Sequence, residues 1–177
     1  SLAISELLLY ANKITLNEPE NTDFFLATPI HINMGELAYG ISAGHGEVHF
    51  TIRSWSTELM EEKSAALIDF INKTCKCHQL ENEMAWTQVF AANVNEKKAV
   101  DAIRKSANEN NYTITERTTP FKWGEDFGLF TQKMKGAMFG LGSGMNLPAL
   151  HNPDYDFPDE IIPTGINMFH NIIKKLN

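Results

Sequence analysis

The chain has 177 residues, of which 43% are hydrophobic and 21% charged, as in globular proteins with a core of their own. With 15 Lys and Arg against 22 Asp and Glu, the net charge is −7. We therefore expect neither nucleic acid nor an anionic membrane as the main partner, because both require a basic surface. No apolar run approaches the ~20 residues that span a bilayer, and no signal peptide is visible.

The first half of the chain is predicted to contain two helices and three strands. Hydrophobic periodicity and strand-type composition place them in the order helix, strand, strand, helix, strand, over residues 2–14, 24–33, 48–53, about 57–74, and 83–90. This is the order of a ferredoxin-like α+β fold whose first strand is missing. A strand before residue 2 would complete a four-stranded antiparallel sheet with two helices on one face.

Local signals refine these elements. Pro29 lacks an amide hydrogen, which predicts an edge position or a bulge in the first strand. In residues 48–53 apolar and polar side chains alternate strictly, which is typical of a half-buried strand. Ser56 or Thr57 is the expected cap of the second helix. The chain begins at Ser1, directly within an apolar helical pattern, which favours a processed chain or a fragment.

The second half is expected to alternate helix and strand, as in a layered α/β fold. The predicted elements are helices at 95–110 and 124–133, strands at 112–117 and 137–141, and a last helix after Pro163. These elements are too few for a complete sheet, so this half also resembles part of a larger domain. We place the boundary between the two domains after residue 91, giving domains 1–91 and 92–177.

The two cysteines, Cys75 and Cys77, are separated by one residue and followed by His78. A relaxed disulfide between them is disfavoured by the Cα separation that a bridge requires. A metal or redox site is the alternative, but zinc sites use wider spacing and a second pair of ligands. Ordinary reduced cysteines are favoured, and they suit a cytoplasmic protein.

Two segments of the second half could support a binding site. Glu125 and Asp126 stand at a predicted helix start, where the dipole stabilises carboxylates, and simple capping explains them equally well. The run 140–144, Gly-Leu-Gly-Ser-Gly, lets backbone approach a ligand closely, although a tight turn is the ordinary explanation. It lacks the Lys and Ser/Thr spacing of a phosphate-binding loop.

Two further side chains are candidates on their own chemistry. His151 follows the glycine-rich run, but a lone histidine is more often a structural hydrogen-bonding residue than a metal ligand. Arg53 lies on the polar face of its strand, where it is either simply solvated or able to bind a substrate carboxylate. The other histidines show no metal-binding spacing: His31, His45, His49, His78 and His170.

The order of these motifs resembles the amidohydrolase branch of the co-catalytic zinc peptidases. The series is Thr-Ile-Arg at 51–53, Gly-Glu-Asp-Phe at 124–127, the glycine-rich run, and Leu-His-Asn-Pro-Asp-Tyr-Asp-Phe at 150–157. Relatives in that family include aminoacylase, carboxypeptidase G, succinyl-diaminopimelate desuccinylase and the auxin-conjugate amidohydrolases. The resemblance covers nearly the whole chain.

The resemblance implies a lid, or dimerisation, domain at 1–91 and the final segment of a catalytic domain at 92–177. It makes His151 the last metal ligand and Arg53 the lid arginine that meets a substrate carboxylate. Gly142 and Ser143 would line the substrate pocket, and Glu125 and Asp126 would lie near the site. Two divalent metal ions are implied, with zinc expected and manganese, cobalt or nickel as alternatives, as is a homodimer formed through the lid.

The chain also departs from the family pattern. The other metal ligands, the glutamate general base and the lid histidine have no counterpart here, and Gly40 stands where the family has asparagine. We therefore expect a part of a metal-dependent amidohydrolase that cleaves N-acyl amino acids or small peptides, with this chain inactive alone. The alternative is a non-enzymatic binding or dimerisation module that associates through the edge of its sheet.

Overall fold

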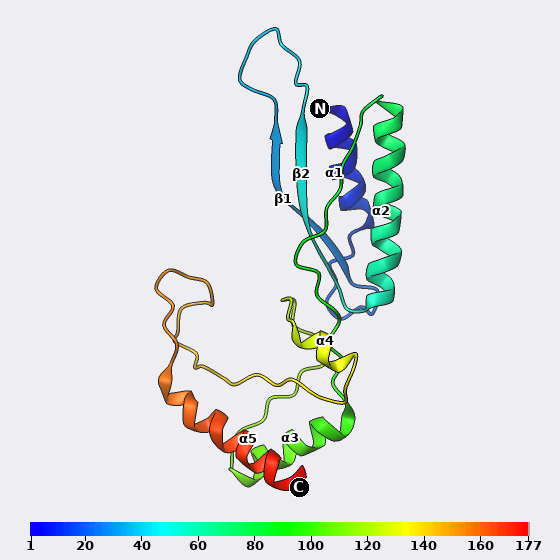
Figure 1. Cartoon of the computed structure of the whole chain (residues 1–177). Coiled ribbons are helices and arrows are strands. Elements are labelled where there is room, and N and C mark those ends of the chain that lie inside the picture. Colours follow the sequence, from blue (N-terminus) through cyan, green and yellow to red (C-terminus); the bar gives the residue numbers. More distant parts are fainter. Residues whose placement is uncertain (177) are drawn as a thin grey trace. The chain divides into compact units, whose positions relative to one another are not determined.

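The computed structural model describes residues 1–176 and divides into two compact units (Figure 1). The first comprises Ser1–Ala92 and Arg117–Gly124, and the second comprises Asn93–Glu116 and the chain from Glu125 onward. The stretch 117–124 thus belongs to the first unit, although in the sequence it lies between two segments of the second unit. No helix in the described part of the chain is long and apolar enough to cross a membrane.

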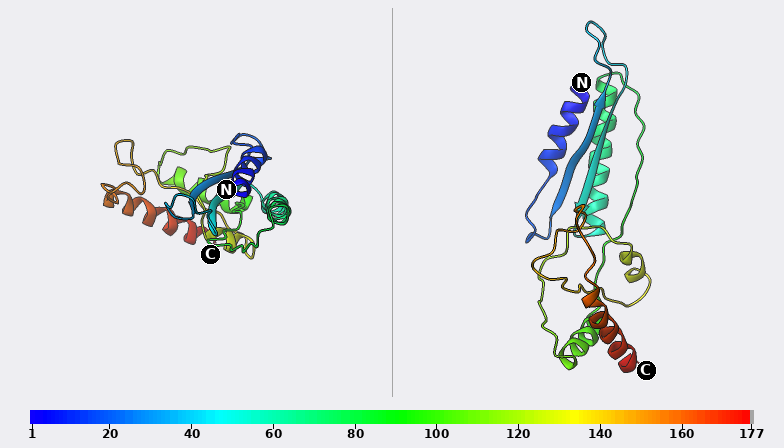
Figure 2. Two further views of the ribbon diagram at one scale, coloured as in Figure 1. Left: turned by 90° about the horizontal axis from the view of Figure 1, so that it is seen from above. Right: turned by 90° about the vertical axis from the view of Figure 1, so that its left-hand side faces the viewer.

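The first unit is a β-hairpin covered by two helices, as Figure 2 also shows. Its elements are α1 (Leu2–Ile14), β1 (Phe25–Met34), β2 (Gly46–Ser54) and α2 (Thr57–Cys77). β1 and β2 are antiparallel and form the two-stranded sheet of the described residues. The predicted helices and the first two predicted strands are confirmed within a few residues at each end, except that α2 continues beyond the expected Thr74.

The core of this unit lies between the helices and one face of the hairpin. Ala11 of α1 and Phe25 of β1 are fully buried, and Met60 of α2 packs against the same cluster. Phe50 and Ile52 of β2 join it, which confirms their predicted inward face. Because side chains alternate along a strand, Arg53 points to the opposite face, which the helices leave open.

Pro29 lies beside an irregularity in β1, as predicted. It pairs with Phe50, but the next pair in the register is His31 with His49, so β1 carries one extra residue, Ile30. Such a bulge is the usual way for a sheet to accommodate a residue that cannot donate a ladder hydrogen bond.

The predicted strand at 83–90 is wrong: the segment has no strand partner and leaves α2 as irregular chain (Figure 1). A strand is defined by ladder hydrogen bonds to a neighbour, and a sequence rich in strand-forming residues remains unpaired when the neighbour is not there. The two cysteines are free, with Cys75 buried and Cys77 exposed, in agreement with the reduced state expected for them.

The second unit is built on helices. It contains α3 (Lys97–Glu109), the five-residue α4 (Phe127–Thr131), a short 3-10 turn (Asp159–Ile161) and α5 (Ile162–Leu176). α3 and α5 pack together, with Ser106, Ala107 and Met168 buried between them. The predicted helices at 95–110 and after Pro163 are confirmed, while the one at 124–133 is shortened to α4.

The predicted strands at 112–117 and 137–141 are wrong, because neither segment pairs with a strand in the described residues. The second segment is held instead by a side chain. The side-chain amide of Asn95 donates to the backbone carbonyl of Met138 and accepts from its backbone N–H, both at 2.9 Å. The backbone N–H of Glu96 donates to the backbone carbonyl of Gly136. An asparagine side chain thus supplies the bonds that a neighbouring strand would have made.

Candidate functional site

Arg53 is held by the stretch 117–124. One terminal nitrogen of its guanidinium, Nη1, donates to the carbonyl of Lys122, and the ammonium of Lys122 donates to the Asn17 side chain at 3.1 Å. The same ammonium lies 5.2 Å from the centre of the Phe24 ring. Arg53 therefore has a partner in the protein, and it is neither buried nor simply solvated. Its remaining donors are available for a ligand on the open face of the hairpin.

His151 lies in a turn and is exposed. The amide of Asn152 donates to the Ala149 carbonyl at 3.0 Å, and the backbone of His151 has φ of 75°. In this left-handed region, any residue other than glycine has a strained backbone, at a cost of about 1 kcal/mol or more. Such strain concentrates at functional positions, where surrounding structure holds a side chain in place. The sequence offered no sign of this conformation.

Glu125 and Asp126 are exposed immediately before α4. Asp126 occupies the N-cap position, but its side chain makes no capping hydrogen bond, and the Leu129 amide bonds to its backbone carbonyl instead. The capping explanation is therefore wrong for the Asp126 carboxylate. Both carboxylates remain available to solvent or to a partner.

Gly142 and Ser143 lie in an exposed loop. A Cβ added at Gly142 would meet no atom within 4 Å, so packing within the described residues does not require glycine there. Gly144 is different, because its φ of 111° is one that other residues rarely adopt. The loop thus turns at Gly144 and leaves the backbone at 142 and 143 open.

The six predicted residues are divided between the two units. Arg53 belongs to the first unit and the other five to the second. Across the described residues, no group of three or more His, Cys, Asp or Glu side chains is placed to hold a metal ion. His151 alone cannot hold one of the two implied metal ions, because zinc sites use three or four protein ligands. The residues present therefore do not form the implied dinuclear centre.

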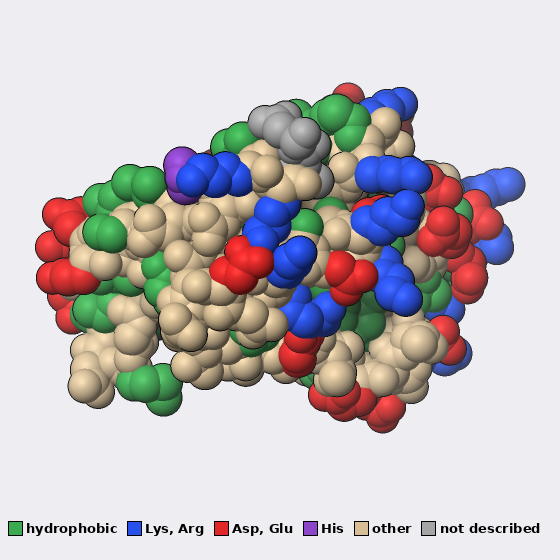
Figure 3. Space-filling view, turned by 90° about the horizontal axis from the view of Figure 1, so that it is seen from below, with side chains coloured by type: hydrophobic (Ala, Val, Ile, Leu, Met, Phe, Trp, Pro, Cys, Tyr) green, Lys and Arg blue, Asp and Glu red, His purple; other side chains and the backbone are tan. Residues whose placement is uncertain are grey.

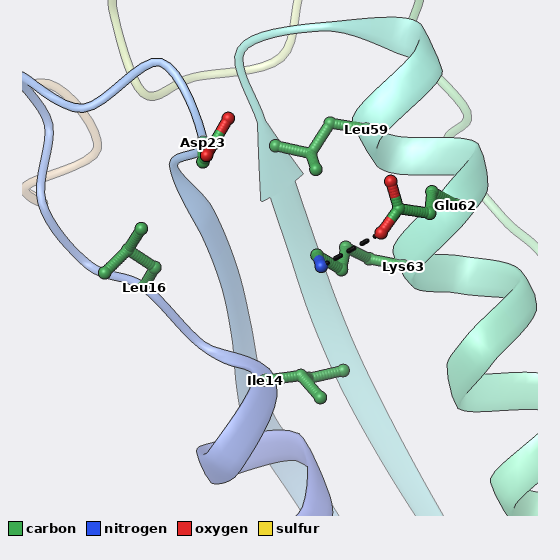
Figure 4. A pocket seen from close by; sticks show the side chains of 6 residues that line it. All are labelled: Ile14, Leu16, Asp23, Leu59, Glu62 and Lys63. Carbon is green, nitrogen blue, oxygen red and sulfur yellow. Dashed lines mark hydrogen bonds and ion pairs between the residues drawn. The ribbon is translucent and has the colours of Figure 1, made fainter.

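The surface pocket shown in Figure 4 lies elsewhere in the first unit, between the end of α1, the loop before β1, and the start of α2. Glu62 and Lys63 form an ion pair at its wall with an N–O distance of 3.1 Å. Its lining residues are Ile14, Leu16, Asp23, Leu59, Glu62 and Lys63. None of the predicted site residues lines it, so it adds nothing to the candidate site.

Charged side chains of the second unit form ion pairs at its surface. Arg104 of α3 bonds to Glu116 at 2.8 Å and to Asp101 at 2.9 Å. The hydrogen bond and the positive charge of Arg104 hold the pKa of Glu116 below its ordinary value. On the face shown in Figure 3, Lys and Arg side chains are interspersed with Asp and Glu.

Sequence reasoning missed one cluster. On the open face of the hairpin, the carboxylate of Glu47 lies near the imidazoles of His31 and His49. His31 is distant from the other two in the sequence, and the spacing of the two histidines is not one that metal sites use. Strand register brings them together, and register could not be read from the sequence alone.

Comparison with known proteins identifies relatives over most of the chain. The sequence model of peptidase family M20/M25/M40 matches residues 10–175. An uncharacterized hydrolase of Staphylococcus epidermidis is 24% identical over 153 residues, which is 81% of this chain and 39% of that protein. An N-acetyldiaminopimelate deacetylase of Exiguobacterium sibiricum is 25% identical over 149 residues, covering 81% of this chain and 40% of the relative.

A solved structure is similar in fold. The YXEP protein of Bacillus subtilis, described as a dinuclear metal-binding peptidase of the M20 family, matches with a TM-score of 0.74 and 16% identity. The match covers 97% of this chain and 44% of that chain. The present chain thus spans about two fifths of the length of the curated relatives it matches. The predicted fold class, an incomplete α+β lid followed by part of a zinc-exopeptidase domain, is consistent with this partial match.

Proposed function

Since this chain belongs to peptidase family M20/M25/M40, we propose that it is the lid, at 1–91, and the carboxy-terminal catalytic segment, at 92–177, of a metal-dependent hydrolase. The substrate would be an N-acyl amino acid or a small peptide, cleaved at its amide bond. The observation that carries the proposal is the family match over residues 10–175. The deacetylase among the relatives supports an acyl amino acid as the substrate class.

Exposed apolar surface on α5 supports a larger assembly. Ile162, Ile166, Phe169 and Ile173 recur at helical spacing, and all four are exposed although they would normally be buried. Contiguous apolar surface of this kind marks a contact with another part of a protein. We assign the contact to the portion of the catalytic domain that lies outside the present 177 residues.

Within this proposal each predicted residue has a role. His151 is a metal ligand, Arg53 binds the substrate carboxylate, and Gly142 and Ser143 line the pocket. Glu125 and Asp126 support the site through their free carboxylates. The remaining ligands and the general base would come from outside this chain, so we derive no catalytic step through the metal. Zinc and a cytoplasmic location belong to the proposal as well.

The test compares two proteins. The 177-residue chain is assayed with zinc, manganese or cobalt against a panel of N-acetyl amino acids, and we expect no turnover. A chain extended on its amino-terminal side to the length of the relatives should hydrolyse members of the panel. His151→Gln in the extended protein should remove a metal ion and abolish turnover, whereas His170→Gln is the matched control. Turnover by the short chain, or full activity of the His151 variant, would contradict the proposal.

A non-enzymatic binding or dimerisation module remains the second candidate. It is favoured by the open sheet, because Ile30 and Ile32 of β1 are exposed and the hairpin is the whole sheet of the described residues. Edge pairing between two copies would produce a homodimer. Light scattering after size-exclusion chromatography is the measurement, and a monomer at every concentration would eliminate this candidate.

A further inference from the structure

The stretch 117–124 carries an exposed aromatic pair beside Arg53. The rings of Phe121 and Trp123 stack face to face, with centroids 4.0 Å apart and an angle of 11° between their planes. The guanidinium carbon of Arg117 lies 4.4 Å from the centre of the Phe121 ring. A guanidinium and a stacked ring at these distances cannot share one face, so both faces of Phe121 are covered. Trp123 is 54% exposed and keeps one face of its indole open to another molecule.

The pair is anchored by Lys122, the residue between its two members. The ammonium of Lys122 donates to the Asn17 side chain at 3.1 Å and lies 5.2 Å from the centre of the buried Phe24 ring. Its backbone carbonyl accepts the hydrogen bond from Arg53. All of these residues belong to the first unit. The open indole face is therefore presented by an anchored stretch of chain, and little conformational entropy is lost when a ligand stacks on it.

Arg53 lies next to the indole in the covalent structure of this stretch. Its hydrogen bond ends on the carbonyl of the peptide unit that joins Lys122 to Trp123, and the contact is exposed. Most of its five N–H donors remain available for an anion. Within the part of the chain that the structure describes, Arg53, Arg117 and Lys122 form no ion pair with a carboxylate. Three unpaired cations together, in a chain of net charge −7, favour the binding of an anion.

The guanidinium and the indole together fit one class of ligand. A planar guanidinium binds a carboxylate through paired hydrogen bonds, and an exposed indole face binds an aromatic ring by stacking. A simple anion would use only Arg53, and a neutral ring would use only Trp123. A small molecule with a carboxylate and an aromatic ring a few bonds apart uses both groups as they stand.

We propose that Arg53 and Trp123 form a binding subsite for small aromatic carboxylates. That this ligand is the substrate rests on the proposed function. In that case the preferred substrates are N-acyl derivatives of aromatic amino acids, and Trp123 is the residue that selects the aromatic side chain. Phe121 and Arg117 are positioning residues, because Phe121 supports the indole from its other face and Arg117 covers Phe121.

The test is a titration of the 177-residue chain with N-acetylphenylalanine, followed by NMR. We expect the indole N–H resonance of Trp123 to shift and the shift to saturate. N-acetylphenylalanine amide lacks the carboxylate and N-acetylalanine lacks the ring, so each should bind more weakly by about tenfold or more. This comparison uses the unchanged chain and does not depend on how any variant folds. Equal binding of the three compounds, or no shift at Trp123, overturns the proposal.

Variants separate the contributions of the two groups, with binding followed through the resonances of the ligand. Trp123→Leu should weaken the binding of N-acetylphenylalanine by about tenfold and leave that of N-acetylalanine unchanged. Arg53→Gln should weaken the binding of both compounds. Trp86→Leu is the matched control, because Trp86 belongs to the same unit and is also 54% exposed. An equal loss in the Trp123 and Trp86 variants would contradict the proposal.

The extended protein separates this proposal from the proposed function. If it hydrolyses N-acetyl amino acids, its kcat/KM should favour N-acetylphenylalanine over N-acetylalanine, and Trp123→Leu should lower that preference by about tenfold. If it hydrolyses none of them while the 177-residue chain binds as expected, the proposed function fails and the subsite stands. Hydrolysis with a preference that does not depend on Trp123 overturns the selecting role of Trp123 and leaves the proposed function intact.

Discussion

The hydroxyl of Ser106 donates a hydrogen bond to the backbone carbonyl of Met168 at 3.0 Å, and both residues are buried. This bond joins α3 to α5, two helices separated by about fifty residues of mostly irregular chain. A buried polar group is tolerated when it is paired, and here the hydroxyl pairs with a carbonyl of the neighbouring helix. The small side chain also lets the two helices approach closely.

Ser106→Ala should destabilise the second unit by about 1 kcal/mol, because it removes a buried hydrogen bond and creates only a small void. Amide hydrogen exchange in α3 and α5 measures this unit separately from the first. Ser5→Ala is the control, since the exposed Ser5 hydroxyl bonds to the Ser1 carbonyl at the start of α1; its effect is measured by exchange of the α1 amides. An equal loss for both variants would show that the interhelical bond contributes nothing.

Ser56→Ala should destabilise the first unit by about 1 kcal/mol, because the Ser56 hydroxyl accepts from the Leu59 amide at 3.1 Å and caps α2. Both Ser56 and Thr57 were candidates for the cap, and the structure assigns it to Ser56. Thr57→Ala should cost less than about 0.5 kcal/mol. Urea denaturation followed by tryptophan fluorescence provides the comparison, and a larger loss for Thr57→Ala would reverse the assignment.

Gln79→Gly should stabilise the first unit by about 0.5–1 kcal/mol. Gln79 follows α2 and has a left-handed φ of 56°, and the backbone N–H of the next residue, Leu80, donates to the Cys75 carbonyl at 2.9 Å. This is the geometry of a helix C-terminus at which glycine is the favoured residue. Asn111 ends α3 in the same way with φ of 57°. Since asparagine tolerates this conformation, Asn111→Gly should gain less. Thermal unfolding measures both, and a loss at Gln79 would contradict the prediction.

The start of α3 should weaken at acidic pH. Glu96 accepts a hydrogen bond from the Ala99 amide at 2.9 Å, and this bond is the main reason why its pKa lies below the ordinary value of 4.5. A lowered pKa in the folded state means that the carboxylate stabilises the fold above pH 4.5 and that this contribution is lost as the pH falls through the folded-state pKa. Glu96→Gln should remove this pH dependence. The measurement is hydrogen exchange of the α3 amides from about pH 3 to about pH 6, a range chosen to include the titration of the carboxyl group.

If the proposed function holds, Arg53→Gln in the extended protein should raise KM for N-acetyl amino acids by roughly tenfold or more, because a charge-assisted bond to the substrate carboxylate is lost. Substrates whose carboxylate is replaced by an amide should be affected much less. Arg53→Lys retains charge but loses the planar fork, so it should be intermediate. If the Arg53 variants raise KM equally for carboxylate and amide substrates, Arg53 has a structural role, through its hydrogen bond to the Lys122 carbonyl.

Helices and the hairpin strands were predictable because their signals are local. The periodicity of residues 2–14 and the alternation around Phe50 depend only on neighbours along the chain. The strand predicted at 83–90 failed for the opposite reason. Its composition suits a strand, but a strand needs a partner, and the described residues supply none.

The candidate site was predictable only in part. The motif order led from His151 to a family, and the match over residues 10–175 confirms that family. The strained backbone of His151 and the bond from Arg53 to the Lys122 carbonyl had no signal in the sequence. Both depend on contacts and turns that local residue patterns do not encode.

By itself the sequence determined the acidic character of the protein, its local helices and hairpin, and its family, because each follows from composition or from neighbouring residues. Only the tertiary structure decided which distant residues meet. It set the strand register that places His31 opposite His49, the membership of 117–124 in the first unit, and the assignment of Arg53 and the other candidates to different units. The physical reason is that strand register and unit membership arise from contacts between segments far apart in the chain.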